Sequence, residues 1–362
     1  MTTEALERTK TFKPAEWIDA QPHYFLLLLM GALGFLAMIF YSWAHLAELG
    51  AEPTVLGALG KAASSWLTMT VAGLAMGLLI FIMASGMTLV FGLMHVLNLG
   101  HGAFITLGAF VGASALAALS GLTQADSLLV NLLAIALAMV AAMLVAGAGG
   151  LVFERLIVRP VYHDPLKQIL VTVGGSIVIL QLIIVFWGPN EIPVSRPGSL
   201  LGSFTFGDVV IEKYRLLAVV VGLAIYAGMQ ALINRTRIGL LIRAGVENTE
   251  MVENLGYRIR LLFVAVFVAG SALAAVGGVM WALYDQMIHS HLGDLRMVQV
   301  IIVIIIGGLG SITGCFYGSL LVGLLFNYLS LVTPMVAEFA SIGLMFAVLM
   351  WRPQGLIPVI RV

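Results

Sequence analysis

Long apolar runs recur along the chain, separated by short stretches that hold nearly all of its charged residues. A helix needs about 20 mainly apolar residues to cross a bilayer. Because lipid offers a bare backbone no hydrogen-bond partner, runs of this length must be helices. The pattern predicts spans near residues 24–46, 66–92, 104–122, 128–153, 168–187, 214–233, 261–284, 297–331 and 339–351.

The run at 297–331 is interrupted by GGLGSITG at 307–314, so we expect two segments that meet at a turn there. Counted separately, they bring the total to about ten transmembrane segments. A glycine-rich interruption also follows the second span. The prediction is therefore an all-α polytopic membrane protein with two pseudo-repeated halves and Gly-broken helices.

Composition agrees with this class, since 61% of the residues are hydrophobic and only 10% are charged. Soluble domains carry roughly 25% charged residues. The 18 basic and 18 acidic residues cancel, so no basic excess indicates nucleic acid. Cys315 is the only cysteine of the sequence, which excludes an intrachain disulfide and a thiolate metal cluster.

The basic residues gather in alternate loops. Of the 18, 13 lie before the first span, between the fourth and fifth, between the sixth and seventh, or after the last. The positive-inside rule then places both termini and the loop 234–260 in the cytoplasm of a multi-pass inner (plasma) membrane protein. This orientation requires the break at 307–314 to be a hairpin that returns toward the outer face.

No Asp, Glu, Lys or Arg falls in the middle of a predicted span. Ion-driven transporters usually carry intramembrane carboxylates or their partners, because something must bind the coupling ion. A separate soluble partner that supplies the energy is the more economical hypothesis.

The first break, GLMHVLNLGHGAFITLGAF at 92–110, holds His95, Asn98, His101 and Gly102 between two apolar runs. Non-helical backbone at membrane depth could bind a polar or zwitterionic solute. The alternative is a cytoplasmic turn whose Asn and His side chains cap helix ends; we favour a pathway for the segment as a whole. Two imidazoles six residues apart lack a third ligand, so no metal site is predicted.

The second break is Gly307, Gly308 and Gly310, at a corresponding place in the second half. Paired broken helices indicate a translocation site between repeats. Gly314 and Gly318 continue a four-residue spacing that favours close approach of another helix. The run lacks the Lys-Ser/Thr ending of a phosphate-binding loop.

The loop 234–260 is the largest polar insertion. Asn248 or Thr249 can cap a short helix with Glu250 in its first turn, and Gly256 can end it. The apolar edge of this helix comprises Met251, Val252 and Leu255. It suits docking of a soluble partner, although a basic loop can also serve only as an orientation signal.

Several of these segments together resemble the permease subunits of branched-chain amino acid ABC importers, a family with relatives for urea, short amides and aromatic acids. The resemblance covers about 66–358 and rests on SGMTLVFGLMHVLNLGHGAFITLGAF, GLLIRAGVENTEMVENLG, IIIGGLGSITG and MWRPQGLI. The segment VLNLGHGAF resembles the first of the two types of permease subunit found in such importers.

The resemblance implies two permease subunits, two cytoplasmic ABC ATPase subunits and an extracytoplasmic solute-binding protein, with no cofactor and no enzymatic activity of this chain. It divides the chain into a cytoplasmic leader (1–23), an extra transmembrane helix (24–46), a permease domain (66–351) and a cytoplasmic tail (352–362).

The loop 239–256 is similar to the family's coupling helix. This makes Arg243, Ala244, Glu247, Glu250, Glu253 and Gly256 candidates for ATPase coupling. Asn98, His101 and Gly102 match the family's Asn and His-Gly positions near the pathway. The chain departs from the family at His95, often Arg, and at Ala103, often Glu; without that carboxylate, direct contact with an ammonium group loses support.

We expect import of a branched-chain or other neutral amino acid. The alternatives are urea, short amides or aromatic or organic acids in the same importer family, or an ATP-independent secondary transporter or channel. An intramembrane enzyme built on Ser85 with His95 or His101 would lack an orienting carboxylate.

Overall fold

The protein is described by a computed structural model that covers residues 21–48, 55–94, 96, 98–162, 164–247, 249–332 and 334–358. Its helices are α2 (Pro22–Glu48), α3 (Val55–Met94), α4 (His101–Ala118), α5 (Ser120–Thr123), α6 (Leu128–Phe153), α7 (Pro165–Trp187), α8 (Lys213–Arg235), α9 (Arg237–Glu247), α10 (Thr249–Asn254), α11 (Ile259–Asp285), α12 (Leu292–Gly307), α13 (Ile312–Val332) and α14 (Pro334–Trp351). Short π and 3₁₀ turns lie at Glu154–Val158, Arg159–Val161 and Gly198–Leu200.

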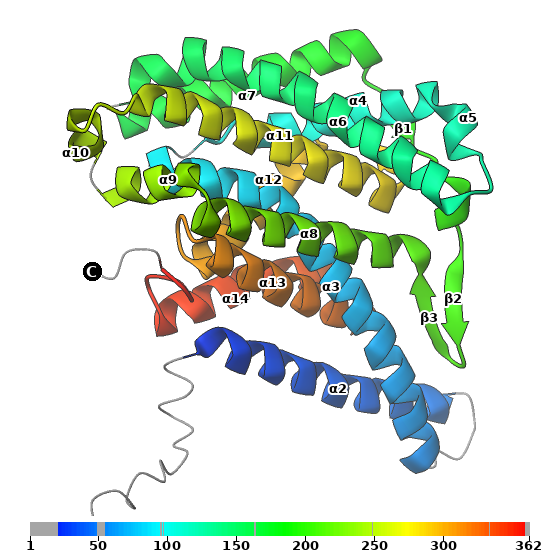
Figure 1. The fold of residues 1–362 in the computed structure, drawn as a ribbon. Helices are drawn as coiled ribbons and strands as arrows, with labels where there is room; N and C mark the ends of the chain where they lie inside the picture. The colour runs from blue at the N-terminus through cyan, green and yellow to red at the C-terminus, as the bar shows by residue number, and fades with distance from the viewer. Residues whose placement is uncertain are drawn as a thin grey trace, which may run out of the picture.

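The little strand structure is confined to one end of the bundle. Strand β1 (Ile192–Pro193) pairs with β4 (Met287–Ile288), and β2 (Ser203–Phe206) pairs with β3 (Val209–Glu212), both antiparallel. The β2–β3 hairpin and α5 lie opposite α9 and α10 along the helix direction (Figure 1).

The predicted all-α polytopic class is confirmed. Among the described residues, eight helices are long and apolar enough to cross a membrane. The other two predicted segments are α12, with 16 residues, and the apolar part of α14, Val336–Trp351. In the eight spans, charged side chains are confined to about two turns at either end. Helix α7 begins where its sequence dictates, because Asp164 accepts from the Lys167 N–H at 3.2 Å and Pro165 opens the first turn.

The predicted hairpin between α12 and α13 is present. Gly308 and Gly310 have φ values of 104° and 79°, a region that favours glycine, and they reverse the chain. A Cβ at Gly318 would lie 2.8 Å from the Val303 carbonyl oxygen, so α12 and α13 touch backbone to backbone. The close-packing interpretation of this glycine is confirmed.

Helix α3 forms the axis of the bundle. In an apolar 18-residue stretch of α3, 89% of the residues are buried, whereas in the corresponding stretch of α8 only 17% are buried. Glycines let its neighbours approach closely: a Cβ at Gly77 would lie 2.7 Å from the Ser319 oxygen of α13, and one at Gly270 of α11 would lie 2.8 Å from the Gly86 oxygen. Figure 1 shows α3 crossing the other helices at the centre.

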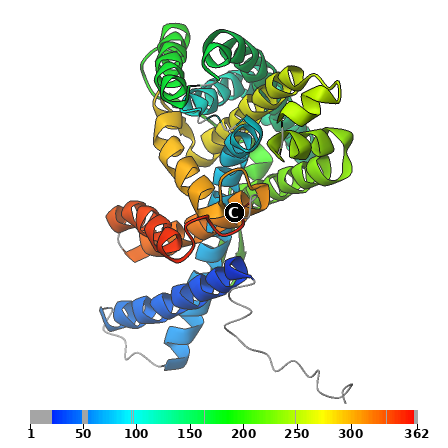
Figure 2. The same ribbon diagram turned by 90° about the vertical axis from the view of Figure 1, so that its left-hand side faces the viewer.

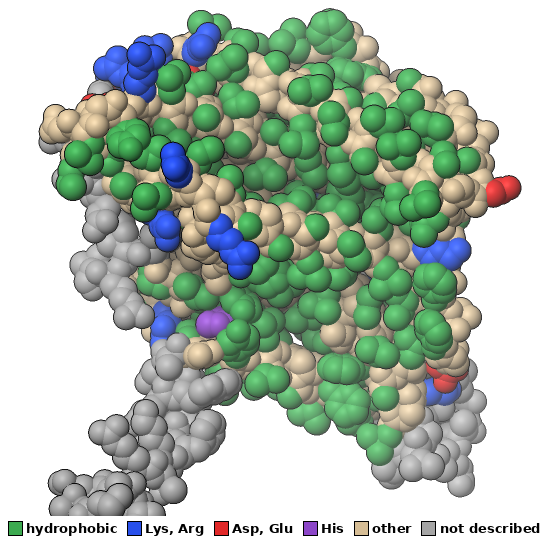
Figure 3. Space-filling view, viewed as in Figure 1, with side chains coloured by type: hydrophobic (Ala, Val, Ile, Leu, Met, Phe, Trp, Pro, Cys, Tyr) green, Lys and Arg blue, Asp and Glu red, His purple; other side chains and the backbone are tan. Residues whose placement is uncertain are grey.

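The surface divides into an apolar belt and a basic end. Figure 3 shows apolar side chains across the sides of the helices and a concentration of Lys and Arg at the end that holds α9 and α10. Exposed basic residues there are Arg155, Arg159, Lys167, Arg235, Arg237, Arg243, Arg258 and Arg260. The belt is the surface expected to face lipid.

Helix α2 stands apart from the main bundle together with the first half of α3 (Figure 2). It is held by the Trp66 indole N–H, which donates to the Gly31 carbonyl at 2.9 Å, and by the Tyr24 hydroxyl, which accepts from the Tyr317 hydroxyl at 3.1 Å. An apolar helix is therefore present where the extra N-terminal span is predicted.

Candidate functional site

The described residues between α3 and α4, which are Val96 and 98–100, are not helical, as predicted for the first break. His101 at the start of α4 hydrogen-bonds the Met83 carbonyl at 2.9 Å through Nε2, which therefore carries the proton. Met83 precedes the end of α3 by eleven residues, which is about 16 Å of helix. Helix α4 thus begins well inside the bundle, and the preceding segment folds back along α3. His95 and Leu97 lie outside the described residues.

Asn98 shapes this segment from within. Its side-chain oxygen accepts from the Gly100 N–H at 3.1 Å, and its carbonyl accepts from the His101 N–H at 3.1 Å. Asn98 and His101 are each 1% exposed. Both side chains therefore hold the turn and the helix start, and whether they also contact a passing solute stays a prediction.

Gly102 meets the start of α12. A Cβ at Gly102 would lie 2.9 Å from the Gly293 oxygen, and the Gly293 N–H donates to the Thr106 hydroxyl at 2.9 Å. The N-termini of α4 and α12 thus converge inside the bundle. Nothing in the sequence singles out Gly293, because the charged neighbours Asp294 and Arg296 lower the hydropathy there.

The second predicted break, at Gly307, Gly308 and Gly310, does not lie beside the first break in the structure. From Gly293 to Gly307, α12 runs unbroken over fourteen residues, about 21 Å. At its end, the Leu356 N–H donates to Ile306 at 2.9 Å and the Ile357 N–H donates to Gly307 at 3.0 Å. The structure therefore brings Asn98, His101 and Gly102 together at one level and places Gly307, Gly308 and Gly310 at another, under the C-terminal segment.

One contact links the two regions. A Cβ at Gly92, near the end of α3, would lie 3.1 Å from the Gly310 oxygen. The α12–α13 turn therefore packs on α3 just before the chain leaves that helix for the first break.

The loop 234–260 folds into two helices, α9 and α10, where the sequence predicts one. Helix α10 ends as predicted: the Gly256 N–H donates to Glu253 at 2.9 Å, the Tyr257 N–H donates to Val252 at 3.3 Å, and Gly256 has φ 88°. Of the predicted apolar edge, Val252 is 3% exposed, whereas Met251 and Leu255 face outward.

The coupling candidates lie along these two helices. Arg243 and Glu253 are exposed, Ala244 is half-buried, and Gly256 is exposed at the turn. Glu247 and Glu250 belong to α9 and α10, but their side chains lie outside the described residues. The exposed Arg243 and Glu253 leave both signs of charge available to a partner.

Helix α9 rests on the end of α3. A Cβ at Gly245 would lie 3.2 Å from Cδ1 of Leu93, the residue before the last of α3. Ile242, on the same helix, is 7% exposed. The loop is therefore seated on the helix end from which the first break departs.

Similarity to known proteins covers most of the chain. Residues 69–350 match the family model described as branched-chain amino acid transport system, permease component. Helix α2 and the start of α3 precede this match. No solved structure matches the chain significantly.

Three relatives carry related names. The high-affinity branched-chain amino acid transport system permease protein BraD of Pseudomonas aeruginosa is 30% identical over 299 residues, which cover 81% of this chain and 95% of that protein. The corresponding LivH of Escherichia coli K12 is 28% identical over 295 residues, 79% of this chain and 93% of LivH. A probable LivH of Methanocaldococcus jannaschii is 23% identical over 251 residues, 68% and 75% of the two chains. This chain is a transport subunit that belongs to the family of permease components of branched-chain amino acid transport systems.

Proposed function

We propose that this chain forms the translocation pathway of an ATP-driven importer for a branched-chain or other neutral amino acid. The observation that carries the proposal is the seat of α9 on α3, where Gly245 packs against Leu93 directly before the first break. A force applied to α9 and α10 can therefore reach the non-helical segment through the end of α3. The names of the relatives support the class of solute.

The proposal includes three kinds of partner. Two ABC ATPase subunits bind the end with α9 and α10, a second permease subunit completes the pathway, and a solute-binding protein docks at the opposite end. The exposed arginines around α9 and α10 support placing that end, and both termini, in the cytoplasm.

In the proposed mechanism, closure of the ATPase dimer pushes α9 and α10 through Arg243, Ala244, Glu247, Glu250, Glu253 and Gly256. The push moves the end of α3, and with it the segment of His95, Asn98, His101 and Gly102 and the adjoining turn of Gly307, Gly308 and Gly310. The contact between Gly102 and Gly293 has little side-chain bulk, so α4 and α12 can slide there. The cavity at the subunit interface then opens alternately to each side.

The energy source must be external in this proposal. Among the described residues of the eight spans, charged side chains lie within about two turns of a helix end. The start of α12 inside the bundle carries one acidic and one basic residue, Asp294 and Arg296, so no net charge is set aside there for a coupling ion. A channel or an ion-coupled transporter would need such a charge or an open pore.

Alanine substitution of Arg243 and of Glu253 tests the coupling. In vesicles that contain the complete importer, we expect both variants to assemble and hydrolyse ATP while solute uptake falls about tenfold or more. Arg260→Ala is the matched control, because Arg260 is an exposed arginine of the same loop outside the coupling helices. Uptake at the wild-type rate in both variants, or an equal loss in the control, would remove the assignment.

A further inference from the structure

A cavity of about 420 Å³ opens at the end of α4 remote from α9 and α10. Its floor is the last two turns of α4, one wall is the end of α7, and its roof is the segment 192–195. The volume lies in the range of small-molecule sites. None of the relatives' names assigns a site here.

One wall of the cavity is apolar and fixed. Phe110 and Ile288 are fully buried, and the Trp187 ring centroid lies 5.6 Å from that of Phe110. The Trp187 indole N–H donates to the Ser114 hydroxyl oxygen at 2.8 Å, which holds the ring in place. This wall suits a compact apolar side chain.

The facing side is polar and uncharged. Ser120, Gln124 and Ser195 line it, and within the described part of the chain their side chains form no hydrogen bond with other protein groups. Hydroxyl and amide side chains can both donate and accept hydrogen bonds, so together they can bind both poles of a zwitterion.

Among the described residues, no charged side chain lines the cavity. A solute with a net charge would lose its hydration there without gaining a counter-charge. An acyl chain of a lipid would leave the three polar side chains unpaired, which is costly for groups that are removed from water.

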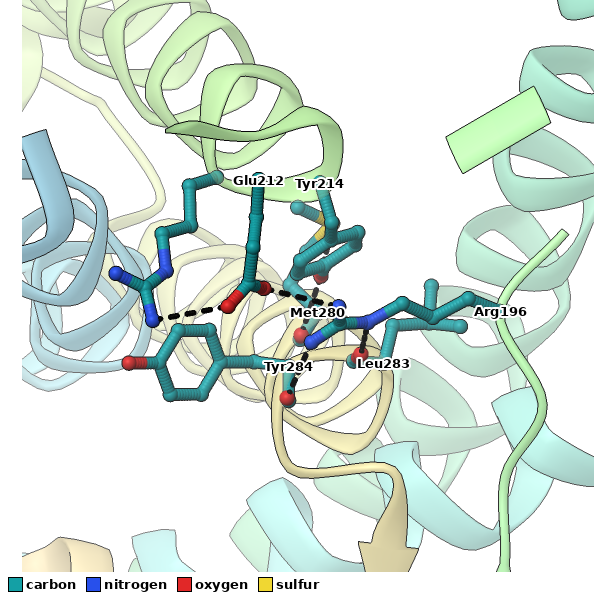
Figure 4. A network of polar contacts seen from close by, with 7 residues as sticks. Arg196, Glu212, Tyr214, Met280, Leu283 and Tyr284 are labelled. Atoms are coloured by element: carbon teal, nitrogen blue, oxygen red, sulfur yellow. Dashed lines mark hydrogen bonds and ion pairs between the residues drawn. The ribbon is translucent and has the colours of Figure 1, made fainter. Parts of the chain in front are cut away.

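The roof is held in position by α11. The Val194 N–H donates to the Gln286 carbonyl at 2.9 Å, and Ile192 pairs with Ile288. Figure 4 shows the next residue, Arg196, whose guanidinium donates to the Leu283 and Tyr284 carbonyls, each at 2.7 Å.

The same guanidinium pairs with Glu212 at 3.0 Å and lies 4.8 Å from the centroid of the Tyr214 ring. Glu212 also binds Arg215 at 3.1 Å. Arg196 therefore caps the C-terminus of α11 and fixes the roof to it. The other end of α11 continues into α10, so the roof and the coupling loop are attached to one helix.

We infer that this cavity is an outer receiving site for a small solute that has zero net charge and an apolar side chain. This inference rests on the proposed function, because it assumes that the chain imports such a solute. The solute places its side chain against Phe110 and Trp187 and its polar groups against Ser120, Gln124 and Ser195. Arg196 is a positioning residue, since it touches the roof and not the solute.

The test uses the complete importer with leucine as the probe, in sealed vesicles for uptake and in nanodiscs for fluorescence. Ala113→Phe fills the cavity, and Ala118→Phe is the control, because Ala118 is exposed on the same helix end and does not line the cavity. We expect Ala113→Phe to raise the KM for leucine uptake about tenfold, equivalent to about 1.4 kcal/mol, and Ala118→Phe to leave it unchanged.

A second readout does not depend on transport. The emission of Trp187, obtained as the difference between wild type and Trp187→Phe, should change on addition of leucine and not of lysine or glutamate. An unchanged KM in Ala113→Phe together with an unresponsive Trp187 overturns the inference, as does quenching of Trp187 by brominated lipid tails with no response to leucine. Loss of ATP-dependent uptake by the wild type would contradict the proposed function alone, because the Trp187 titration still decides the site.

Discussion

Replacing Gly293 by alanine tests whether the direct contact between α4 and α12 holds the two helix starts together. The new methyl group would overlap the backbone of Gly102, and a backbone cannot rotate away as a side chain can. Overpacking of this kind costs about 1–3 kcal/mol, and the upper part of the range applies to rigid neighbours. Alanine recovers at most about 1 kcal/mol through its helix propensity. We therefore expect a net loss of about 2 kcal/mol in the free energy of unfolding.

Gly174→Ala is the matched control. Gly174 lies inside α7, and no atom lies within 4 Å of the Cβ that alanine would add. Only the propensity gain applies there, so this variant should be about 0.5–1 kcal/mol more stable than the wild type. Equilibrium unfolding by titration with sodium dodecyl sulfate, followed by circular dichroism, measures both. Equal stabilities of Gly293→Ala and Gly174→Ala would refute the reasoning about this contact.

Three further substitutions and one pH titration probe other parts of the account. Trp66→Phe removes the hydrogen bond to Gly31 and should weaken the attachment of α2 by about 1 kcal/mol of free energy. Limited proteolysis should then cleave the chain faster ahead of α3, and unchanged cleavage would contradict this. Gly256→Ala forces alanine to φ 88° at the end of α10 and should lower the free energy of unfolding by about 1 kcal/mol. The variant should also bind the ATPase more weakly in a pull-down, and binding equal to that of the wild type would contradict this. Gly355→Ala places a Cβ 2.5 Å from Gly308 and should destabilise the α12–α13 turn by about 2 kcal/mol in the same unfolding assay, unlike Gly343→Ala, which meets no atom within 4 Å. Hydrogen bonds from Lys167 hold the pKa of the Asp164 carboxyl below its ordinary 3.8, so the cap of α7 should be lost as the pH falls through that lowered pKa. Hydrogen exchange of the Lys167 amide measures this loss. Exchange that is independent of pH after correction for the intrinsic rate, or identical in Asp164→Ala, would contradict the prediction.

The apolar runs of the sequence and the glycine-rich interruptions between them predicted most of the spans. The bounds of α6 coincide with the predicted 128–153, and the hairpin at Gly307 and Gly308 is where the break in the apolar run places it. These elements follow from local composition, since a lipid-facing helix needs only length and apolarity.

The features missed by the sequence depend on tertiary contacts. Helix α12 starts at Leu292, five residues before the predicted 297, because Arg296 is accommodated by the Trp281 ring, 4.4 Å away, and by Gln299. Helix α9 is stabilised by its packing on the end of α3, and no periodic pattern of apolar residues in the sequence predicts that contact. The pairing of Gly102 with Gly293 likewise joins residues far apart in the sequence.

The receiving cavity could not be predicted for the same reason. Its walls come from α4, α7 and the segment 192–195, and no single segment carries a recognisable motif. In the sequence Arg196 counts only as one of the few basic residues of the opposite face. The structure shows that it binds two carbonyl groups of α11 and Glu212.

Solute uptake into vesicles, with and without the ATPase subunits, tests the central claim most directly. With the second permease, the binding protein, the ATPases and MgATP present, the account predicts accumulation of radiolabelled leucine against its gradient. The chain without ATPases should accumulate none, whatever proton or sodium gradient is imposed. Accumulation under an ion gradient in the absence of ATPase subunits would contradict the account.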